Sequence, residues 1–336
     1  RTATHYAPPL PKSAGEGVSQ DLPPQWSIEW KRQKSSQSGG QRRQMHKWIA
    51  LLLVVLLLAG CAARGEGPEQ PGAPPGEVRI GFFPNVPHAQ AVLGVAGGTF
   101  ARQMGAEVRP RLFTSGSAAI QALFADELDL LYVGPAPAIQ AYLRSDGAAL
   151  RVIAGAASGG SVFVLRPGVD RHDLRGTRLA TPGIGNSQDA ALRFLLLQEG
   201  WRTRERGGDV TVSPMAPAEV LTLFSRGELD GAWVAEPWAS RLILEAGGVL
   251  AIDERDLWPE GRVPTTVVAV HPDFLRRHPE TVRRFLEAHV AITREIQADP
   301  EGSRAQVQQA LADLQGRPLS DEVMESAWGR IDFTYD

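Results

Sequence analysis

From residue 78 onward, short apolar runs alternate with amphipathic stretches of helical period. Apolar runs bounded by turn residues predict strands, and the longer periodic stretches predict helices. The predicted strands are 78–83, 107–113, 129–133, 150–156, 161–165, 178–180, 209–212, 229–234, 249–252 and 265–270. The predicted helices are 89–103, 117–124, 135–144, 187–198, 218–225, 237–245, 272–277, 279–298, 300–314 and 320–331. This alternation predicts an α/β fold with parallel sheets covered by helices on both faces.

One pattern occurs twice along the chain. Segments 123–135 and 223–237 each contain Leu-Phe, then Glu-Leu-Asp, then an apolar strand that leads to a proline. The repetition predicts two related α/β lobes. Ligands of open α/β sheets bind beyond the carboxyl ends of the strands. Two lobes whose strand ends face each other would therefore enclose a cleft.

The residues before the folded part predict export. Met45 and the basic pair His46-Lys47 precede an apolar run, 48–58, that is too short for a membrane span of ~20 residues. Leu58-Ala59-Gly60-Cys61 then resembles a bacterial lipoprotein lipobox. The resemblance implies cleavage before Cys61, diacylation of its thiol and a membrane anchor. An ordinary signal peptide or a buried helix is the alternative.

The segments before and after this export signal have a polar composition rich in Pro and Gly. Residues 1–44 mix Pro, Ser, Gln and Gly without apolar periodicity, and we interpret them as an upstream segment translated from a wrong start, or as disorder. Residues 62–76 are rich in Pro and Gly and predict a flexible tether.

The composition and the catalytic motifs that the sequence lacks exclude several classes of function. The chain has 336 residues, enough for two lobes, and its net charge of −3 gives no sign of nucleic-acid binding. A single cysteine excludes an internal disulfide, and no Cys/His cluster suggests a metal. We find no P-loop, no His-Glu-x-x-His and no Gly-x-Ser-x-Gly, so the sequence predicts neither a cofactor nor catalysis. His278 and His289 are expected on solvated helix faces or ends.

Several turns next to predicted strands and helices carry small, hydroxyl or amide residues. They are 114–117, 134–135, 158–161 and 183–188. Backbone N–H groups at helix N-termini bind anions without Lys or Arg. The same Ser, Thr and Asn side chains could instead only cap their helices.

Aromatic and acidic residues near strand ends suggest the rest of the cleft. Trp238 and Phe83 could contact the carbon skeleton of a ligand, whereas Trp233, inside its strand, is expected in the core. Glu236 could bind a ligand amine or the opposite lobe, or it could cap the helix that follows. His88 is the histidine that we place near the cleft.

These motifs carry a family resemblance that covers nearly all of the chain from Val78. The chain resembles the solute-binding proteins of nitrate, aliphatic sulfonate and taurine ABC importers. The matching stretches are 81–88 (Gly-Phe-Phe-Pro-Asn-Val-Pro-His), 132–138 (Tyr-Val-Gly-Pro-Ala-Pro-Ala), 151–156 (Arg-Val-Ile-Ala-Gly-Ala), 180–189 (Ala-Thr-Pro-Gly-Ile-Gly-Asn-Ser-Gln-Asp) and 232–238 (Ala-Trp-Val-Ala-Glu-Pro-Trp).

The resemblance implies the two-lobed periplasmic-binding fold with two crossovers, which we place near 165–167 and 263–265. Lobe 1 would comprise 77–166 and 265–336, and lobe 2 would comprise 167–264. Family members usually continue past the segment that resembles 331–336, so one or two bracing helices of lobe 1 are expected to be missing. The resemblance, together with the turns described above, predicts these ligand-binding residues: Asn85, His88, Ser115, Gly134, Pro135, Ser161, Asn186, Ser187, Glu236 and Trp238.

The resemblance implies a monomeric, extracytoplasmic protein that is not an enzyme. It would capture a small anion, such as an aliphatic sulfonate, nitrate or taurine, and deliver it to the ABC permease. A thiamine-precursor (pyrimidine) binder is an alternative, and its pocket should use stacked aromatics and a carboxylate. A menaquinone-precursor enzyme of the same fold is another, which the lipobox disfavours. A surface sensor domain is the last, but no kinase or cyclase segment follows.

Overall fold

The computed structural model of the protein describes residues 75–336. The predictions for the upstream segment, the export signal with Cys61 and most of the tether lie outside the described residues. Within residues 75–336, no helix has the length and the apolar character that crossing a membrane requires.

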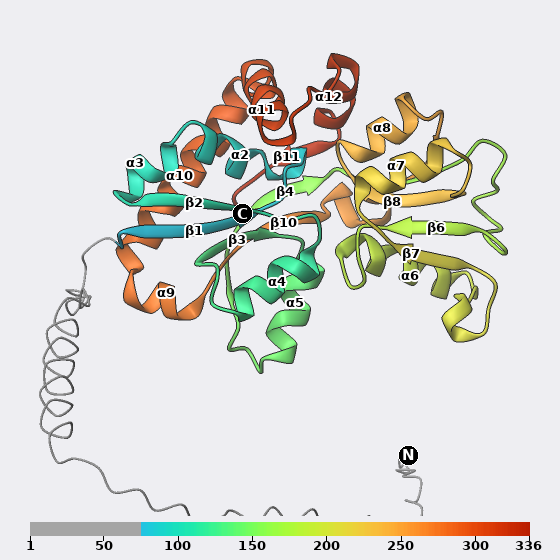
Figure 1. Ribbon diagram of the computed structural model, residues 1–336, viewed down its shortest axis with the longest axis horizontal. Coiled ribbons are helices and arrows are strands. Elements are labelled where there is room, and N and C mark those ends of the chain that lie inside the picture. Colours follow the sequence, from blue (N-terminus) through green and yellow to red (C-terminus); the bar gives the residue numbers. More distant parts are fainter. Residues whose placement is uncertain (1–74) are drawn as a thin grey trace, which may run out of the picture. The chain divides into compact units, whose positions relative to one another are not determined.

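The first sheet has six strands in the order β11-β4-β10-β3-β1-β2 (Figure 1). Its strands are β1 (Glu77–Phe82), β2 (Glu107–Leu112), β3 (Leu130–Val133), β4 (Arg151–Gly159), β10 (Pro264–Val270) and β11 (Ile331–Phe333). β1 pairs in parallel with β2 and β3, whereas β10 is antiparallel to β3 and β4, and β11 is antiparallel to β4. The sheet is therefore mixed, and the expected parallel arrangement holds for β1, β2 and β3 only.

The second sheet has five strands in the order β7-β6-β8-β5-β9. Its strands are β5 (Ser161–Leu165), β6 (Arg178–Thr181), β7 (Thr211–Pro214), β8 (Gly231–Ala235) and β9 (Val249–Asp253). β6 pairs in parallel with β7 and β8, and β5 is antiparallel to β8 and β9. Each sheet thus combines parallel strands with an antiparallel strand next to the place where the chain changes sheets.

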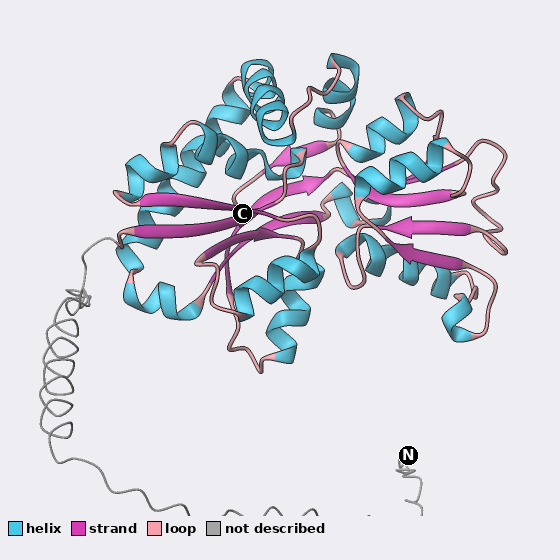
Figure 2. Ribbon diagram, viewed as in Figure 1, coloured by secondary structure: helices cyan, strands magenta, loops and turns pink. Residues whose placement is uncertain are grey.

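Helices cover both faces of each sheet, as expected (Figure 2). The helices around the first sheet are α2 (Ala89–Ala96), α3 (Thr99–Met104), α4 (Gly116–Phe124), α5 (Pro135–Arg144), α9 (Pro272–Arg277), α10 (Pro279–Ala298) and α11 (Pro300–Gln315). The helices around the second sheet are α6 (Ser187–Gln198), α7 (Pro217–Ser225) and α8 (Trp238–Leu244). We call the first group and its sheet lobe 1, and the second group and its sheet lobe 2. Helix α12 (Asp321–Trp328) contacts both lobes: it lies against α8 of lobe 2, while its Val323, Met324 and Ala327 side chains are buried in the core of lobe 1, whose sheet β11 then joins.

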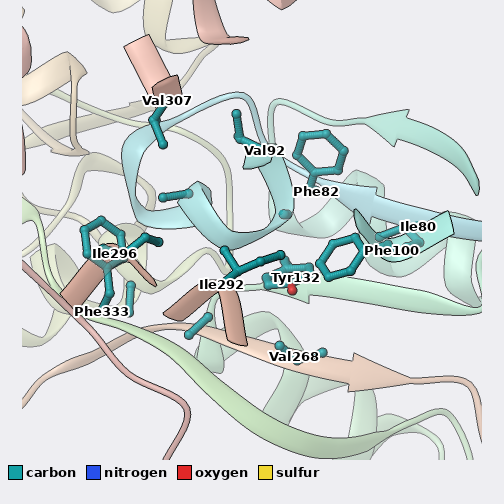
Figure 3. Close-up of a cluster of buried hydrophobic side chains, with 14 of the residues drawn as sticks. Ile80, Phe82, Val92, Phe100, Tyr132, Val268, Ile292, Ile296, Val307 and Phe333 are labelled. Atoms are coloured by element: carbon teal, nitrogen blue, oxygen red, sulfur yellow. The ribbon is translucent and has the colours of Figure 1, made fainter. Parts of the chain in front are cut away.

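The largest core lies between the first sheet and helices α2, α3, α10 and α11 (Figure 3). Side chains alternate across a strand, so Val78, Ile80 and Phe82 of β1 all reach this core. Phe100 of α3 packs on Phe285 of α10 with ring centroids 4.8 Å apart. Burying each such ring contributes roughly 1.5–3 kcal/mol, which fixes the frame from which the loops of lobe 1 project.

Two local features differ from the sequence prediction. The helix expected at 89–103 is interrupted at Gly97 and Gly98, because Gly98 has a left-handed backbone (φ 66°) that ends α2 and starts α3. The helix expected at 320–331 ends at Trp328, and Ile331–Phe333 form the edge strand β11. So short an edge strand leaves little periodic signal in the sequence.

Two histidines also lie elsewhere than expected. His289 is 0% exposed on the inner face of α10, where its Nδ1 is 2.9 Å from the Tyr132 hydroxyl and its Nε2 is 2.9 Å from the Gly155 carbonyl oxygen. His278 is buried as well. The expectation of solvated histidines is therefore wrong. Burial lowers the pKa of His289 to about 4, so it serves as a neutral core group.

The chain passes from the first sheet to the second at Gly159 and Gly160, between β4 and β5, and not at 165–167 as expected. Both glycines have left-handed backbones (φ 78° and 72°), which glycine adopts without a Cβ clash. The chain returns just before β10, at the expected place. The two crossings are bonded together: Gly159 N–H donates to the Val263 carbonyl (3.0 Å), and the Thr265 hydroxyl donates to the Gly159 carbonyl (2.6 Å).

A substitution tests this crossing. A Cβ at residue 159 would lie 2.5 Å from the carbonyl oxygen of Arg330. We expect Gly159→Ala to lower the free energy of unfolding by about 1–2 kcal/mol for the left-handed backbone and by a further ~1–3 kcal/mol for the crowding. Gly168→Ala is the matched control, because Gly168 has φ 87° with no atom near its Cβ position. Urea denaturation measures both, and equal losses in the two variants would contradict this view of the crossing.

Candidate functional site

A cavity of about 340 Å³ lies between the two lobes. This volume suits a small molecule. Lobe 1 contributes the segments after β1, β2 and β3, the start of β10 and the end of α11. Lobe 2 contributes the segment after β6 and the starts of α7 and α8. The cavity thus lies beyond the carboxyl ends of parallel strands from both sheets, where the sequence placed it.

The lobes touch at the cavity through the segment before α6. The Gly116 N–H at the start of α4 donates to Asn186 Oδ1 at 3.0 Å, and the Ala136 N–H at the start of α5 donates to Ser187 Oγ at 3.4 Å. Outside the cavity, Gln140 Nε2 donates to the Gly185 carbonyl at 3.0 Å. Asn186 makes no side-chain cap to its own helix. Its amide therefore joins the lobes, and the capping alternative does not describe it.

Fewer backbone donors are free at these helix starts than the sequence suggested. Pro135 and Pro137 have no N–H, so Ala136 supplies the donor of that turn and already bonds Ser187. At α4, the Ser115 hydroxyl caps the helix by accepting from the Ala118 N–H at 3.4 Å. An anion in this cavity must therefore use side-chain donors as well as backbone amides.

His88 lines the cavity as a neutral group. Its ring is buried and packs edge-on against Phe83, with centroids 4.8 Å apart. Its Nδ1 accepts the Phe83 N–H at 3.4 Å. Burial lowers the pKa of His88 to about 3, so the imidazole is uncharged near neutral pH.

Aromatic and proline side chains form the apolar walls. Phe83 and Phe113 meet edge-on at 6.5 Å, and Trp238 lies at the start of α8. The Arg241 guanidinium is stacked over Trp238 at 4.8 Å from the ring centroid and is paired with Glu245 at 2.9 Å. This stacking fixes the indole while the arginine charge is compensated by its partner. Trp233 lies in the core at 0% exposure, as expected.

The structure brings most of the predicted site residues to one place. Those that line the cavity are Asn85, His88, Ser115, Gly134, Asn186, Ser187 and Trp238. Those that do not line it are Pro135, Ser161 and Glu236.

Each of these three has another role. Pro135 is the first residue of α5. The Ser161 hydroxyl accepts from the Trp233 indole N–H at 3.1 Å, inside lobe 2. Glu236 is fully buried; its Oε2 accepts the Ser240 N–H at 2.9 Å and so caps α8, while its Oε1 accepts from Arg330 Nη1 at 2.9 Å. Glu236 thus caps α8, which is one of the roles that the sequence suggested for it. It also joins the start of α8 to the segment after α12.

Other lining residues escaped the sequence reasoning. Thr265 and Thr266 come from the second crossing, and Gln315 and Arg317 come from the end of α11 and the turn after it. Gln315 Nε2 donates to the Pro84 carbonyl at 2.6 Å, which brings this C-terminal turn to the segment after β1. No local pattern marks them, because about 230 residues separate Gln315 from Pro84. Their contribution depends on tertiary structure.

Two α/β lobes around one shared cavity define the fold of the two-lobed periplasmic binding proteins. An alkanesulfonate-binding protein of Xanthomonas axonopodis pv. citri, solved with MOPS, is similar with a TM-score of 0.66 and 20% identity, covering 79% of this chain and 88% of that one. The periplasmic nitrate-binding protein of Synechocystis PCC 6803 gives a TM-score of 0.63 at 16% identity, covering 78% and 74%.

The chain belongs to the NMT1-like family, which matches residues 71–312. The taurine-binding periplasmic protein of Escherichia coli (strain K12) is 26% identical over 234 residues, which are 69% of this chain and 71% of that protein. A putative aliphatic sulfonates-binding protein of Bacillus subtilis (strain 168) is 27% identical over 249 residues, 71% of this chain and 70% of that protein.

The buried pair of Glu236 and Arg330 generates a prediction about pH. Burial raises the pKa of Glu236 above its usual value, although Arg330 and the Ser240 N–H lower it. A raised pKa in the folded state means that stability is fully present below the unfolded pKa and is lost as pH rises through the folded pKa. We expect Arg330→Met to lower the free energy of unfolding by about 3 kcal/mol at about pH 8, where Glu236 is left charged and unpaired. Near pH 5 the loss should be smaller, because the carboxyl can take up a proton.

Denaturant titrations at the two pH values measure this effect. The control is the double variant Glu236→Gln/Arg330→Met, which removes both charges and should lose the pH-dependent part of the effect. If Arg330→Met is equally destabilised at both pH values, Glu236 does not carry the buried charge.

Proposed function

We propose that this chain is the extracytoplasmic substrate-binding component of an ABC importer and that it captures a small anion, with an aliphatic sulfonate as the leading candidate. The observation that carries the proposal is the cavity shared by two lobes, in which amide, hydroxyl and helix-start groups of both lobes meet through the Gly116–Asn186 bond. The taurine, sulfonate and nitrate binders to which the chain is similar support it. We further propose that the protein acts as a monomer, anchored through a lipid on Cys61, and is not an enzyme.

The proposed mechanism is capture by lobe closure. A ligand that touches both lobes favours the arrangement in which they meet, because only differential affinity shifts a conformational equilibrium. In this arrangement α5 of lobe 1 and α6 of lobe 2 lie side by side. The permease would read the surface that closure brings together. We propose Asn85, His88, Ser115, Gly134, Asn186, Ser187 and Trp238 as the ligand-contacting set.

The pyrimidine alternative finds less support. Such a pocket should carry a carboxylate, and among residues 75–336 no Asp or Glu lines the cavity. Glu236, the acid that the sequence offered, is directed to Arg330 and the start of α8.

A thermal-shift panel of alkanesulfonates, nitrate, bicarbonate, taurine and pyrimidines on residues 77–336 tests the function. By mass action, a ligand present at ~100 times its Kd should stabilise the protein by about 2.7 kcal/mol. A shift with a sulfonate and none with pyrimidines is the expected result. A panel in which no anion shifts the melting temperature would contradict the proposal.

Asn186→Ala tests the contact between the lobes. We expect ligand affinity to fall about 2–10-fold, the effect of one hydrogen bond of net worth 0.5–1.5 kcal/mol. The fold should be intact, because Asn186 makes no cap. Gln140→Ala is the matched control, since it removes a bond between the lobes outside the cavity. Calorimetry measures both. Unchanged affinity in Asn186→Ala would remove this residue from the site.

A further inference from the structure

The walls of the cavity carry an uneven set of charges. Among the described residues 75–336, its lining contains no Asp or Glu, and its basic members are His88 and Arg317. His88 is buried and uncharged near neutral pH. Arg317 is therefore the one lining residue in this part of the chain that bears a net charge, and that charge is positive.

Arg317 is an exposed residue that lines the cavity, and its neighbours fix the position of its backbone there. Arg317 follows Gly316, the residue that ends α11. Gln315, the last residue of α11, donates from its Nε2 to the Pro84 carbonyl. Asn85, which follows Pro84 in the chain, also lines the cavity. Arg317 has no acidic partner among residues 75–336, whereas Arg241, close to the same cavity, is paired with Glu245. The positive charge at the cavity is thus uncompensated by the described part of the protein.

Two polar atoms in the same wall also lack partners. Thr266 is 1% exposed, and its Oγ1 makes no hydrogen bond within the described residues. Asn85 Oδ1 is buried and likewise has no partner there. Buried polar groups are normally bonded, so these two side chains of lining residues are candidates to bond a bound molecule after a small side-chain rotation. A hydroxyl or an ammonium can donate to both oxygens, and a carboxylate fits when the Thr266 hydroxyl donates and the Asn85 amide is turned to present its NH2. The charge of Arg317 therefore decides among these three groups.

We propose that the cavity selects a sulfonate whose far end is a hydroxyl or a carboxylate and discriminates against one whose far end is an ammonium. The sulfonate would lie at the Ser115, Asn186 and Ser187 end, and the second group would face Asn85, Thr266 and Arg317. An ammonium there would meet a guanidinium and no carboxylate. A carboxylate would form a charge-assisted pair with Arg317. This inference rests on the proposed function and specifies its substrate class.

Three two-carbon sulfonates of nearly equal size separate these cases. They are isethionate, with a hydroxyl; sulfoacetate, with a carboxylate; and taurine, with an ammonium. Calorimetry near pH 7, where taurine keeps its ammonium, should give a Kd for taurine about threefold above that for isethionate, because like charges repel even where solvent screens them. Sulfoacetate should bind at least as tightly as isethionate.

Arg317→Gln identifies the group responsible. The variant should lose about threefold in sulfoacetate affinity, as expected for a lost charge-assisted contact at an exposed residue, while isethionate affinity changes less and taurine affinity stays or improves. Arg277→Gln is the matched control, because Arg277 is an exposed arginine on α9 away from the cavity and the variant has the same net charge. It should change none of the three affinities.

The outcomes are distinguishable. If no sulfonate binds, the proposed function itself fails. If isethionate or sulfoacetate binds but taurine binds equally well or better, the substrate class is overturned and the proposed function stands. If Arg317→Gln leaves the ratio of sulfoacetate to isethionate affinity unchanged, the assignment to Arg317 is overturned.

Discussion

The structure depends on two neighbouring crossings of the chain that are bonded to each other. The Gly159 carbonyl accepts from the Thr265 hydroxyl, and the Gly159 N–H donates to the Val263 carbonyl, so the outgoing and returning chains leave the first sheet together. Each crossing continues directly into an antiparallel strand, β5 in one sheet and β10 in the other. This constraint sets the carboxyl ends of the parallel strands of the two sheets on either side of one cavity. It also places Thr265 and Thr266 in the cavity wall, because the returning chain passes there.

The ligand-binding groups of the cavity depend on which backbone N–H groups at the helix starts remain without a partner. Helix α5 begins with two prolines within its first three residues, and the amide between them bonds Ser187. The first amide of α4 bonds Asn186. These backbone N–H groups are therefore used in hydrogen bonds between the two lobes. Recognition must draw on side chains, and these come from segments far apart in sequence, including Asn85 and Arg317.

The elements with strong local signals could be predicted from the sequence. Pro135, Pro272 and Pro279 each begin a helix at the expected residue, since proline favours the first helical position. The turns after β2, β3 and β6 lie at the cavity because strand ends meet there in any fold of this class. Three features lacked such signals. The short strand β11 and the first crossing are fixed by pairing with distant strands, and Arg317 reaches the cavity through the bond of Gln315 to Pro84.

The hydrogen bonds between the lobes around the cavity are individually weak. The bonds of Asn186, Ser187 and Gln140 contribute about 0.5–1.5 kcal/mol each, so together they bias the lobes only modestly. Besides the two chain crossings, the segment from α12 to β11 also connects the lobes. Arg330 bonds Glu236 of lobe 2, and the next residue, Ile331, begins a strand of lobe 1. Helix α12 is held on both sides, because the buried Glu236–Arg330 pair ties the segment after it to lobe 2 while its Val323, Met324 and Ala327 side chains are buried in the core of lobe 1. The lobes can therefore part by bending at Gly159, Gly160 and Val263 only if either the Glu236–Arg330 pair or the packing of α12 on the core of lobe 1 gives way.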